Sequence, residues 1–137
     1  MNKISSTDVK VLMVEDEPFI RATLRHMLNR IRVGNIFEAD NVDVGFSETI
    51  RVRPNIVLCD INLSGESGLT YLQKVRASII PGFKKLPVVM LTGDSSEVSV
   101  IEARKNNVSG YLLKPVSPVM LCRSMERALG IRFQMRT

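Results

Sequence analysis

Five short apolar runs occur along the chain, and each is separated from the next by a longer amphipathic stretch. The runs are rich in valine, isoleucine and leucine, and Gly, Pro or Asn precede several of them, which is the pattern of buried strands. We therefore predict strands over residues 9–14, 35–39, 56–59, 86–92 and 110–113.

The stretches between these runs carry apolar residues three and four positions apart, a spacing that predicts one buried face of a helix. Pro18 suits the first turn of the first helix, and Ser117 followed by Pro118 suits the start of the last. The helix expected over about residues 96–106 has the weakest apolar stripe. The other stripes are Ile20, Leu24, Met27, Leu28 and Ile31; Val42, Phe46 and Ile50; Leu69, Leu72 and Val75; and Leu121, Cys122, Met125, Ala128 and Leu129.

The alternation of strands and helices predicts an α/β fold with an open parallel five-stranded sheet. Continuously apolar strands fit a sheet that helices cover on both faces. In such sheets, ligands bind beyond the carboxyl ends of the strands. We therefore expect the chemistry of this chain at the residues that follow its strands.

Composition narrows the class of protein. The 137 residues suit one domain, and no apolar run approaches the ~20 residues of a membrane helix. With no signal-peptide pattern at the start, a cytoplasmic location is expected.

Cys59 and Cys122 lack metal-ligand spacing and are predicted to be reduced core residues, and a lone His26 argues against a zinc site. The net charge of +5 is spread out, which favours acidic protein partners over direct nucleic-acid binding.

The residues at the predicted strand ends share one chemistry. The first strand leads into Glu15 and Asp16, the third into Asp60, the fourth ends in Thr92 and the fifth leads into Lys114. Carboxylates that converge repel one another unless a cation lies between them, and oxygen ligands suit Mg²⁺ or Mn²⁺. Lys114 and Thr92 would suit the oxygens of a phosphoryl group, with Asp60 as the nucleophile that accepts it as an acyl phosphate.

Each residue also has a simpler interpretation when it is taken alone. Asp16 could cap a helix, Thr92 could belong to a turn and Lys114 could be a surface lysine. Asp60 is harder to explain in that way, because it directly follows an apolar run. We expect it just past the buried strand, at the mouth of a crevice, where Asp16 and Lys114 share the site.

Four motifs in order resemble the receiver domain of two-component response regulators. They are "VLMVEDEP", "IVLCDINLSGESG", "VVMLTGD" and "GYLLKPV", within residues 9–129. The resemblance implies a flavodoxin-like (βα)5 sheet with strand order 2-1-3-4-5. It also suggests residues 9–130 as the receiver domain, 1–8 as an N-terminal extension and 131–137 as a C-terminal tail.

The resemblance also implies a role for individual residues, one motif at a time. Asp60 matches the phosphorylated aspartate, Thr92 and Lys114 match the groups that contact the phosphoryl oxygens, and Thr92 with Tyr111 matches the switch pair. For the metal, Asp16 matches a direct magnesium ligand, Glu15 a ligand through water, and Asn62 the position whose backbone carbonyl binds the ion. The side chains of Asn62 and Asp94 match residues that tune dephosphorylation, and the bond between Lys114 and Pro115 matches one that is usually cis.

The chain departs from the family pattern at several positions. Glu15 stands where aspartate is common, and Ser64 and Glu66 stand where proline and methionine are frequent. Gly93 follows Thr92 where alanine is usual. None of these changes removes a reacting group.

The expected function is a phosphorylation-dependent switch rather than an enzyme. A histidine kinase or a histidine phosphotransfer protein would phosphorylate Asp60, and the face of the fourth helix, fifth strand and fifth helix would then regulate a protein target. A haloacid-dehalogenase-type phosphatase would need an aspartate where Asn62 stands. The open alternative is the receiver portion of a larger DNA-binding regulator or hybrid kinase, and a single-domain receiver of the chemotaxis type is the first expectation.

Overall fold

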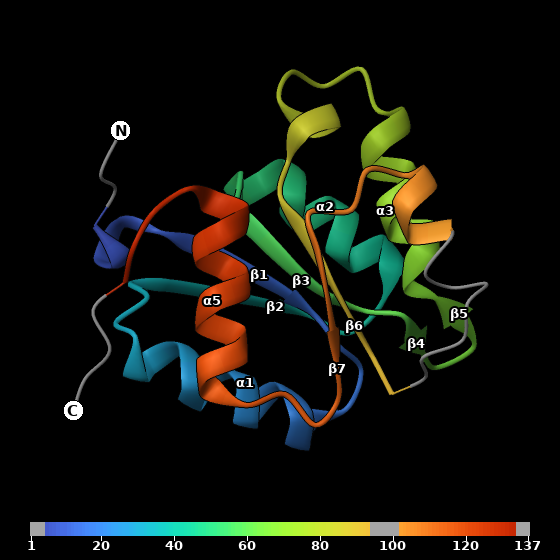
Figure 1. The fold of residues 1–137 in the computed structure, drawn as a ribbon. Coiled ribbons are helices and arrows are strands. Elements are labelled where there is room, and N and C mark those ends of the chain that lie inside the picture. The colour runs from blue at the N-terminus through green and yellow to red at the C-terminus, as the bar shows by residue number, and fades with distance from the viewer. Residues whose placement is uncertain (1–4, 94–101, 134–137) are drawn as a thin grey trace.

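The computed structural model describes residues 5–93 and 102–133. In this part of the chain, five parallel strands form one sheet in the order β2-β1-β3-β6-β7 (Figure 1). Since these are the predicted strands one to five, the predicted order 2-1-3-4-5 is confirmed. The strands are β1 Lys10–Val14, β2 Asn35–Ala39, β3 Ile56–Asp60, β6 Val88–Thr92 and β7 Gly110–Leu113.

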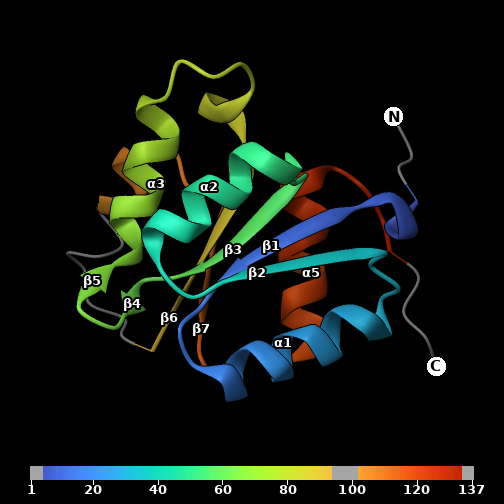
Figure 2. The same ribbon diagram turned by 180° about the vertical axis from the view of Figure 1, so that it is seen from behind.

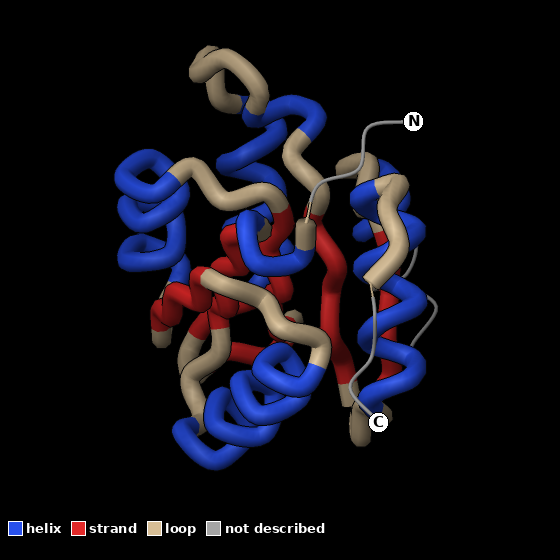
Figure 3. Tube along the Cα trace, turned by 90° about the vertical axis from the view of Figure 1, so that its left-hand side faces the viewer, coloured by secondary structure: helices blue, strands red, loops and turns tan. Residues whose placement is uncertain are grey.

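Helices cover both faces of this sheet, as the apolar strands predicted. Helix α5 lies in front of the strands in Figure 1 and behind them in Figure 2, whereas α3 lies on the opposite side. The edge-on view in Figure 3 shows the strands between the two groups of helices. The helices are α1 Pro18–Arg30 and α5 Pro118–Leu129 on one face, and α2 Val42–Val52 and α3 Gly68–Ala77 on the other.

Shorter elements complete the described chain. Residues 102–105 are helical, and the rest of the helix predicted over 96–106 lies largely outside the described residues. A small antiparallel hairpin, which the sequence pattern did not predict, follows β3 directly. The short elements are the 3-10 turns η1 Ser6–Asp8 and η2 Phe83–Lys85, and the hairpin strands β4 Asn62–Leu63 and β5 Glu66–Ser67.

Successive residues of the central strands point to opposite faces and so build two cores. In β1, Val11 and Met13 join the core under α1 and α5, whereas Leu12 and Val14 join the core under α2 and α3. Both cores are fully enclosed at these positions, since all four residues are 0% exposed. Side chains buried on both faces hold the strands, and therefore the strand ends, in a fixed order.

The predicted helix starts are confirmed. Pro18 is in the first turn of α1. The Ser117 hydroxyl accepts a hydrogen bond from the Met120 amide at 3.2 Å, and Pro118 is the first residue of α5.

Both cysteines are buried and carry free thiols. None of the helices in the described part of the chain combines the length and the apolar character that a membrane crossing requires.

The buried stripe of α2 differs from the prediction. Ile50 is 41% exposed, and the buried positions include Gly45 and Thr49 instead. A Cβ atom at Gly45 would lie 3.0 Å from a Val14 methyl group, so glycine lets the helix approach the sheet closely. The Thr49 hydroxyl is hydrogen-bonded at 2.6 Å to the Tyr71 hydroxyl, which makes this polar group tolerable in the core.

The core also extends beyond the predicted domain end at residue 130. Gly130 adopts a positive φ of 68° and ends α5, and the chain then turns back onto the sheet. Ile131 and Phe133 are buried in the core under α1 and α5, 6% and 8% exposed. The Phe133 amide donates to the Glu126 carboxylate at 2.8 Å. Apolar side chains after the helix therefore complete the core, and the division of the chain at residue 130 stays a prediction.

Arg76, near the end of α3, joins three parts of the chain through its guanidinium. Its nitrogens donate to four backbone carbonyls at 2.8–2.9 Å, those of Phe83, Leu86, Asn106 and Asn107. These carbonyls belong to the segment before β6 and to the turn before β7. Arg76 thus fixes the entry to two strands whose far ends carry predicted site residues.

We predict that Arg76→Met lowers the free energy of unfolding by about 3 kcal/mol, because charged hydrogen bonds are lost and carbonyl groups are left unpaired. Urea denaturation followed by circular dichroism measures the change. Arg51→Met is the matched control, since Arg51 forms an exposed pair with Glu48 and should cost only about 0.5 kcal/mol. Equal losses in the two variants would contradict the assigned role of Arg76.

Candidate functional site

The carboxyl ends of four strands bring the predicted site residues together at one edge of the sheet. Glu15 and Asp16 follow β1, Asp60 ends β3, Thr92 ends β6 and Lys114 follows β7. Because β1, β3, β6 and β7 are parallel neighbours, all four ends lie on the same side. The sheet therefore assembles groups that are as much as 99 residues apart in the sequence.

The Lys114 ammonium connects two buried carboxylates. Its nitrogen lies 2.6 Å from Oδ2 of Asp60 and 3.0 Å from Oε1 of Glu15. Asp60 is 3% exposed and Glu15 is 1% exposed. A buried carboxylate without a counter-charge costs several kcal/mol, so the lysine is what makes this arrangement tolerable.

The expected position of Asp60, just past the buried strand, is wrong. Asp60 is the last residue of β3 and is aligned with Leu91 of β6 in the sheet. Its Oδ1 atom accepts a hydrogen bond from the Asn62 amide at 3.2 Å. With Lys114 on one oxygen and a backbone amide on the other, the carboxylate can stay inside the strand.

The shared environment shifts the proton affinity of Lys114 and Glu15. Burial raises the pKa of Glu15 to about 7, although its hydrogen bond with Lys114 acts in the opposite direction. Desolvation acts to lower the pKa of Lys114, but its hydrogen bonds to Asp60 and Glu15 prevail and raise that pKa above its ordinary value. The lysine is therefore held in its charged form between the two carboxylates.

Asp16 contacts the hairpin after β3 instead of capping a helix. Its Oδ2 atom accepts hydrogen bonds from the Ser64 amide, at 3.0 Å, and from the Ser64 hydroxyl. The hydroxyl bond is the main reason that the pKa of Asp16 lies below its usual value. The N-cap position of α1 is occupied by Glu17, so the simpler interpretation of Asp16 as a cap does not apply.

Three carboxylates form a group that could hold a divalent cation. One oxygen from each of Glu15, Asp16 and Asp60 lies within 4.8 Å of the others. An all-oxygen donor set of this kind suits Mg²⁺, which takes carboxylates together with water. The residues present therefore fit the predicted cation, and Asn62 lies next to them as an exposed residue of β4.

The predicted switch residues lie in neighbouring strands. Thr92 is buried at the end of β6, and its carbonyl accepts a hydrogen bond from the Lys114 amide at 2.7 Å. Tyr111 is half-buried in β7 and is aligned with Met90 of β6. The Lys114–Pro115 bond is cis. Asp94 lies outside the described residues, and the functional roles of all these residues remain predictions.

The acidic turn formed by Glu15 and Asp16 after β1 is supported by residues that the sequence pattern did not indicate. Arg21 donates to the Glu15 carbonyl at 2.7 Å and to the Glu38 carboxylate at 3.2 Å, and Arg25 contacts Glu38 at 2.7 Å. The spacing of Arg21 and Arg25, four positions apart on a helix, placed both on one face. Without the position of β2, nothing in the sequence indicated that Glu38 faces them.

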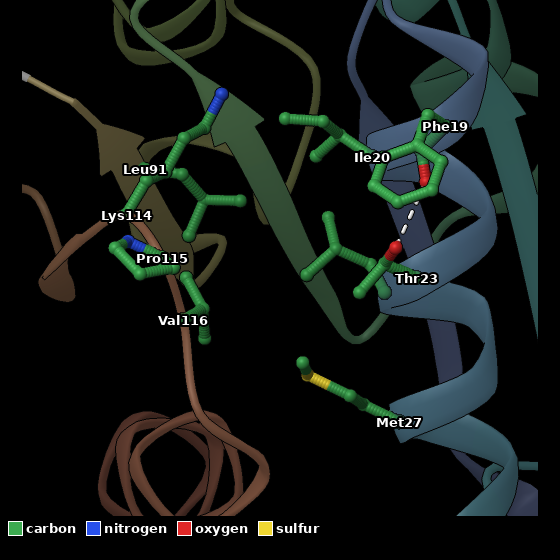
Figure 4. Close-up of a pocket in the computed structure, with 9 residues that line it drawn as sticks. Phe19, Ile20, Thr23, Met27, Leu91, Lys114, Pro115 and Val116 are labelled. Atoms are coloured by element: carbon green, nitrogen blue, oxygen red, sulfur yellow. Dashed lines mark hydrogen bonds between the residues drawn. The ribbon is translucent and has the colours of Figure 1, made fainter.

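An apolar pocket of about 150 Å³ adjoins Lys114. Figure 4 shows side chains of α1 on one side of it and those of Leu91 and of the segment after β7 on the other. Phe19 is 81% exposed at its rim. The lining residues are Phe19, Ile20, Thr23, Leu24 and Met27 of α1, together with Leu91, Lys114, Pro115 and Val116.

A family model matches most of the chain. The model of the response regulator receiver domain matches residues 11–126. Since the match covers most of the chain, the chain belongs to this family, whose members are signalling domains rather than conventional enzymes.

Two individual relatives show which members of this family the chain resembles. The chain is 29% identical over 123 residues to the chemotaxis protein CheY1 of Helicobacter pylori, a match that covers 89% of this chain and 98% of that protein. The crystal structure of CheY4 of Vibrio cholerae matches with a TM-score of 0.81 at 26% identity, over 88% of this chain and 98% of that one. Receivers of the chemotaxis, single-domain type are thus similar in sequence and in fold.

A further match concerns a longer protein. The nitrate/nitrite response regulator protein NarL of Escherichia coli is 27% identical over 119 residues, which are 86% of this chain but only 53% of NarL. The same receiver unit therefore also occurs within a larger regulator.

We predict that Lys114→Met lowers the free energy of unfolding by about 3 kcal/mol, because two buried carboxylates lose their counter-charge. The loss should be smaller when Glu15→Gln is added, since one of those charges is then removed. Lys105→Met is the control, because Lys105 forms only an exposed pair with Glu102. Denaturant unfolding measures all of these variants, and a Lys114 loss no greater than the control would disprove the role of the lysine.

Proposed function

We propose that this chain is a signalling switch that accepts a phosphoryl group on Asp60 from a histidine kinase or a histidine phosphotransfer protein. The observation that carries the proposal is the position of the Asp60 carboxylate, 2.6 Å from Lys114 and within the group formed with Glu15 and Asp16. This arrangement supplies a nucleophile, a fixed positive charge and a set of oxygen ligands at one point.

The residues support the following chemistry. An Asp60 oxygen attacks the phosphorus of the donor, the bond to the donor nitrogen breaks, and an acyl phosphate forms. Lys114, already charged, neutralises an oxygen of the transferred group. Glu15, Asp16 and Asp60, with Asn62, would hold Mg²⁺ or Mn²⁺, which when bound neutralises further charge on the phosphoryl oxygens.

The output step involves Thr92 and Tyr111. In this proposal the Thr92 hydroxyl moves toward the phosphoryl group and Tyr111 turns inward, which shifts a two-state equilibrium. The neighbouring surface supports a protein partner, since Leu113 of β7 and Val119 and Met120 of α5 are 46%, 52% and 48% exposed. Asn62 and Asp94 would tune the later hydrolysis of the acyl phosphate. The proposed switch acts in the cytoplasm.

A second candidate is the receiver portion of a larger DNA-binding regulator or hybrid kinase. The observation that favours it is the similarity to NarL, in which the matching segment makes up 53% of the protein. The phosphorylation chemistry is the same in both cases, and the length of the full gene product decides between them.

Asp60→Asn tests the proposed acceptor. Incubation with Mg²⁺ and acetyl phosphate should add the mass of one phosphoryl group to the wild type and none to the variant, because a neutral amide is a far weaker nucleophile than a carboxylate. Intact-mass spectrometry measures the product. Asp40→Asn, an exposed aspartate after β2, is the matched control and should behave like the wild type. Labelling of both Asp60→Asn and wild type, or of neither, would exclude Asp60 as the acceptor.

The apolar pocket beside Lys114 suggests where the phosphodonor binds. A protein donor must bring its histidine to Asp60, so its surface must cover the rim of the site. Phe19 and Pro115 line the adjoining pocket, and Lys114 belongs to both the pocket and the site. Aromatic side chains, phenylalanine among them, are enriched at the cores of protein interfaces.

We predict that Phe19→Ala slows phosphotransfer from a histidine donor that phosphorylates the wild type by about tenfold, through weaker binding. Phosphorylation by acetyl phosphate should stay unchanged, because this small donor needs no docking surface. Ile79→Ala is the control, since Ile79 is 95% exposed and lies after α3 on the other face of the sheet. Radiolabel transfer under single-turnover conditions measures the rates, and an equal effect of Phe19→Ala on both donors would contradict this role.

A further inference from the structure

The hairpin that follows β3 presents Ser64 to the acidic turn after β1. Strands β4 and β5 pair Leu63 with Glu66, which leaves Ser64 and Gly65 as a two-residue turn. Gly65 has a φ of +73°, a conformation that favours glycine. Leu63 is 6% exposed and anchors the hairpin in the core. The turn is thus a fixed element.

A second contact fixes the other strand of the hairpin. The Glu66 carboxylate accepts a hydrogen bond from the Val42 amide at 3.1 Å, at the start of α2. The Ser67 hydroxyl accepts one from the Leu69 amide at 3.1 Å and so caps α3. Both contacts hold the hairpin to helices, and neither involves the carboxylates of the site.

Ser64 donates two hydrogen bonds to one oxygen of Asp16. The amide lies 3.0 Å from Oδ2, and the hydroxyl contacts the same atom. The other oxygen, Oδ1, takes no bond from Ser64. Asp16 is only half-buried, so its side chain would otherwise be able to leave the position in which its carboxylate meets those of Glu15 and Asp60.

We propose that Ser64 is a positioning residue for the cation site, because it holds Asp16 with one oxygen directed to the hairpin and the other available to the metal. This inference rests on the proposed function, since it takes the group of Glu15, Asp16 and Asp60 as the cation site. Hydrogen bonds to a ligating carboxylate orient it, and their loss usually weakens metal binding by a factor of about 10 to 100.

This arrangement depends on the residue that this chain carries at position 64. A proline there could donate neither bond, because it has no amide hydrogen and no hydroxyl group. The contact from Ser64 to Asp16 is therefore a property of this sequence. It links the loop after the acceptor strand to the metal ligand after β1, two segments 48 residues apart.

Calorimetric titration with MgCl₂ at a fixed pH tests the proposal. We expect Ser64→Ala to raise the dissociation constant by about tenfold, because the hydroxyl bond to Asp16 is lost. Ser64→Thr keeps both donors and should bind like the wild type. Ser67→Ala is the matched control in the same hairpin and should lower the melting temperature while leaving the dissociation constant unchanged. Ser64→Gly, which also lacks the hydroxyl, repeats the test in case the alanine variant does not fold.

The outcomes separate this inference from the proposed function. Wild-type affinity in the Ser64→Ala and Ser64→Gly variants, with normal phosphorylation of wild-type Asp60 by acetyl phosphate, would overturn the role of Ser64 alone. Weak binding by Ser64→Thr would also overturn it, because both donors are then present. A wild-type protein that neither binds Mg²⁺ nor accepts a phosphoryl group would overturn both the role of Ser64 and the function itself.

Discussion

The contact between the Lys114 ammonium and two buried carboxylates determines how the rest of the site is arranged. Lys114 lies 2.6 Å from Asp60 and 3.0 Å from Glu15, and both carboxylates are almost inaccessible to solvent. Without this positive charge, either carboxylate would have to leave the interior or bind a proton. The order of the strands makes the contact possible, because β7 brings the lysine to the edge where β1 and β3 end.

A separate element of the fold holds each acidic group. Asp60 is fixed by its own strand and by the Asn62 amide, and Asp16 is fixed by Ser64 of the hairpin. Arg21 of α1 holds the backbone at Glu15. Among the described residues, no buried side-chain nitrogen or oxygen atom lacks a hydrogen-bond partner. The negative charges are thus kept close together by surrounding donors, which is the condition under which a cation or a phosphoryl group can be bound with little rearrangement.

The sequence predicted the parts of this molecule that depend on local pattern. Strand positions followed from apolar runs, helix starts followed from Pro18 and Ser117, and the four motifs indicated which residues meet at the strand ends. It did not predict contacts that depend on tertiary position. The stripe of α2 contains Gly45 and Thr49, which a search for apolar residues overlooks, and the burial of Ile131 and Phe133 depends on a turn after α5.

The site is built from segments that are very distant along the chain, since Glu15 and Lys114 are 99 residues apart. No local piece of the protein contains both Asp60 and the lysine that compensates its charge. A chain on which β7 has not yet paired with β6 therefore lacks the lysine that compensates Asp60. Under the proposed function, Asp60 would become able to receive a phosphoryl group only once the sheet is complete, so phosphorylation would mark folded chains alone.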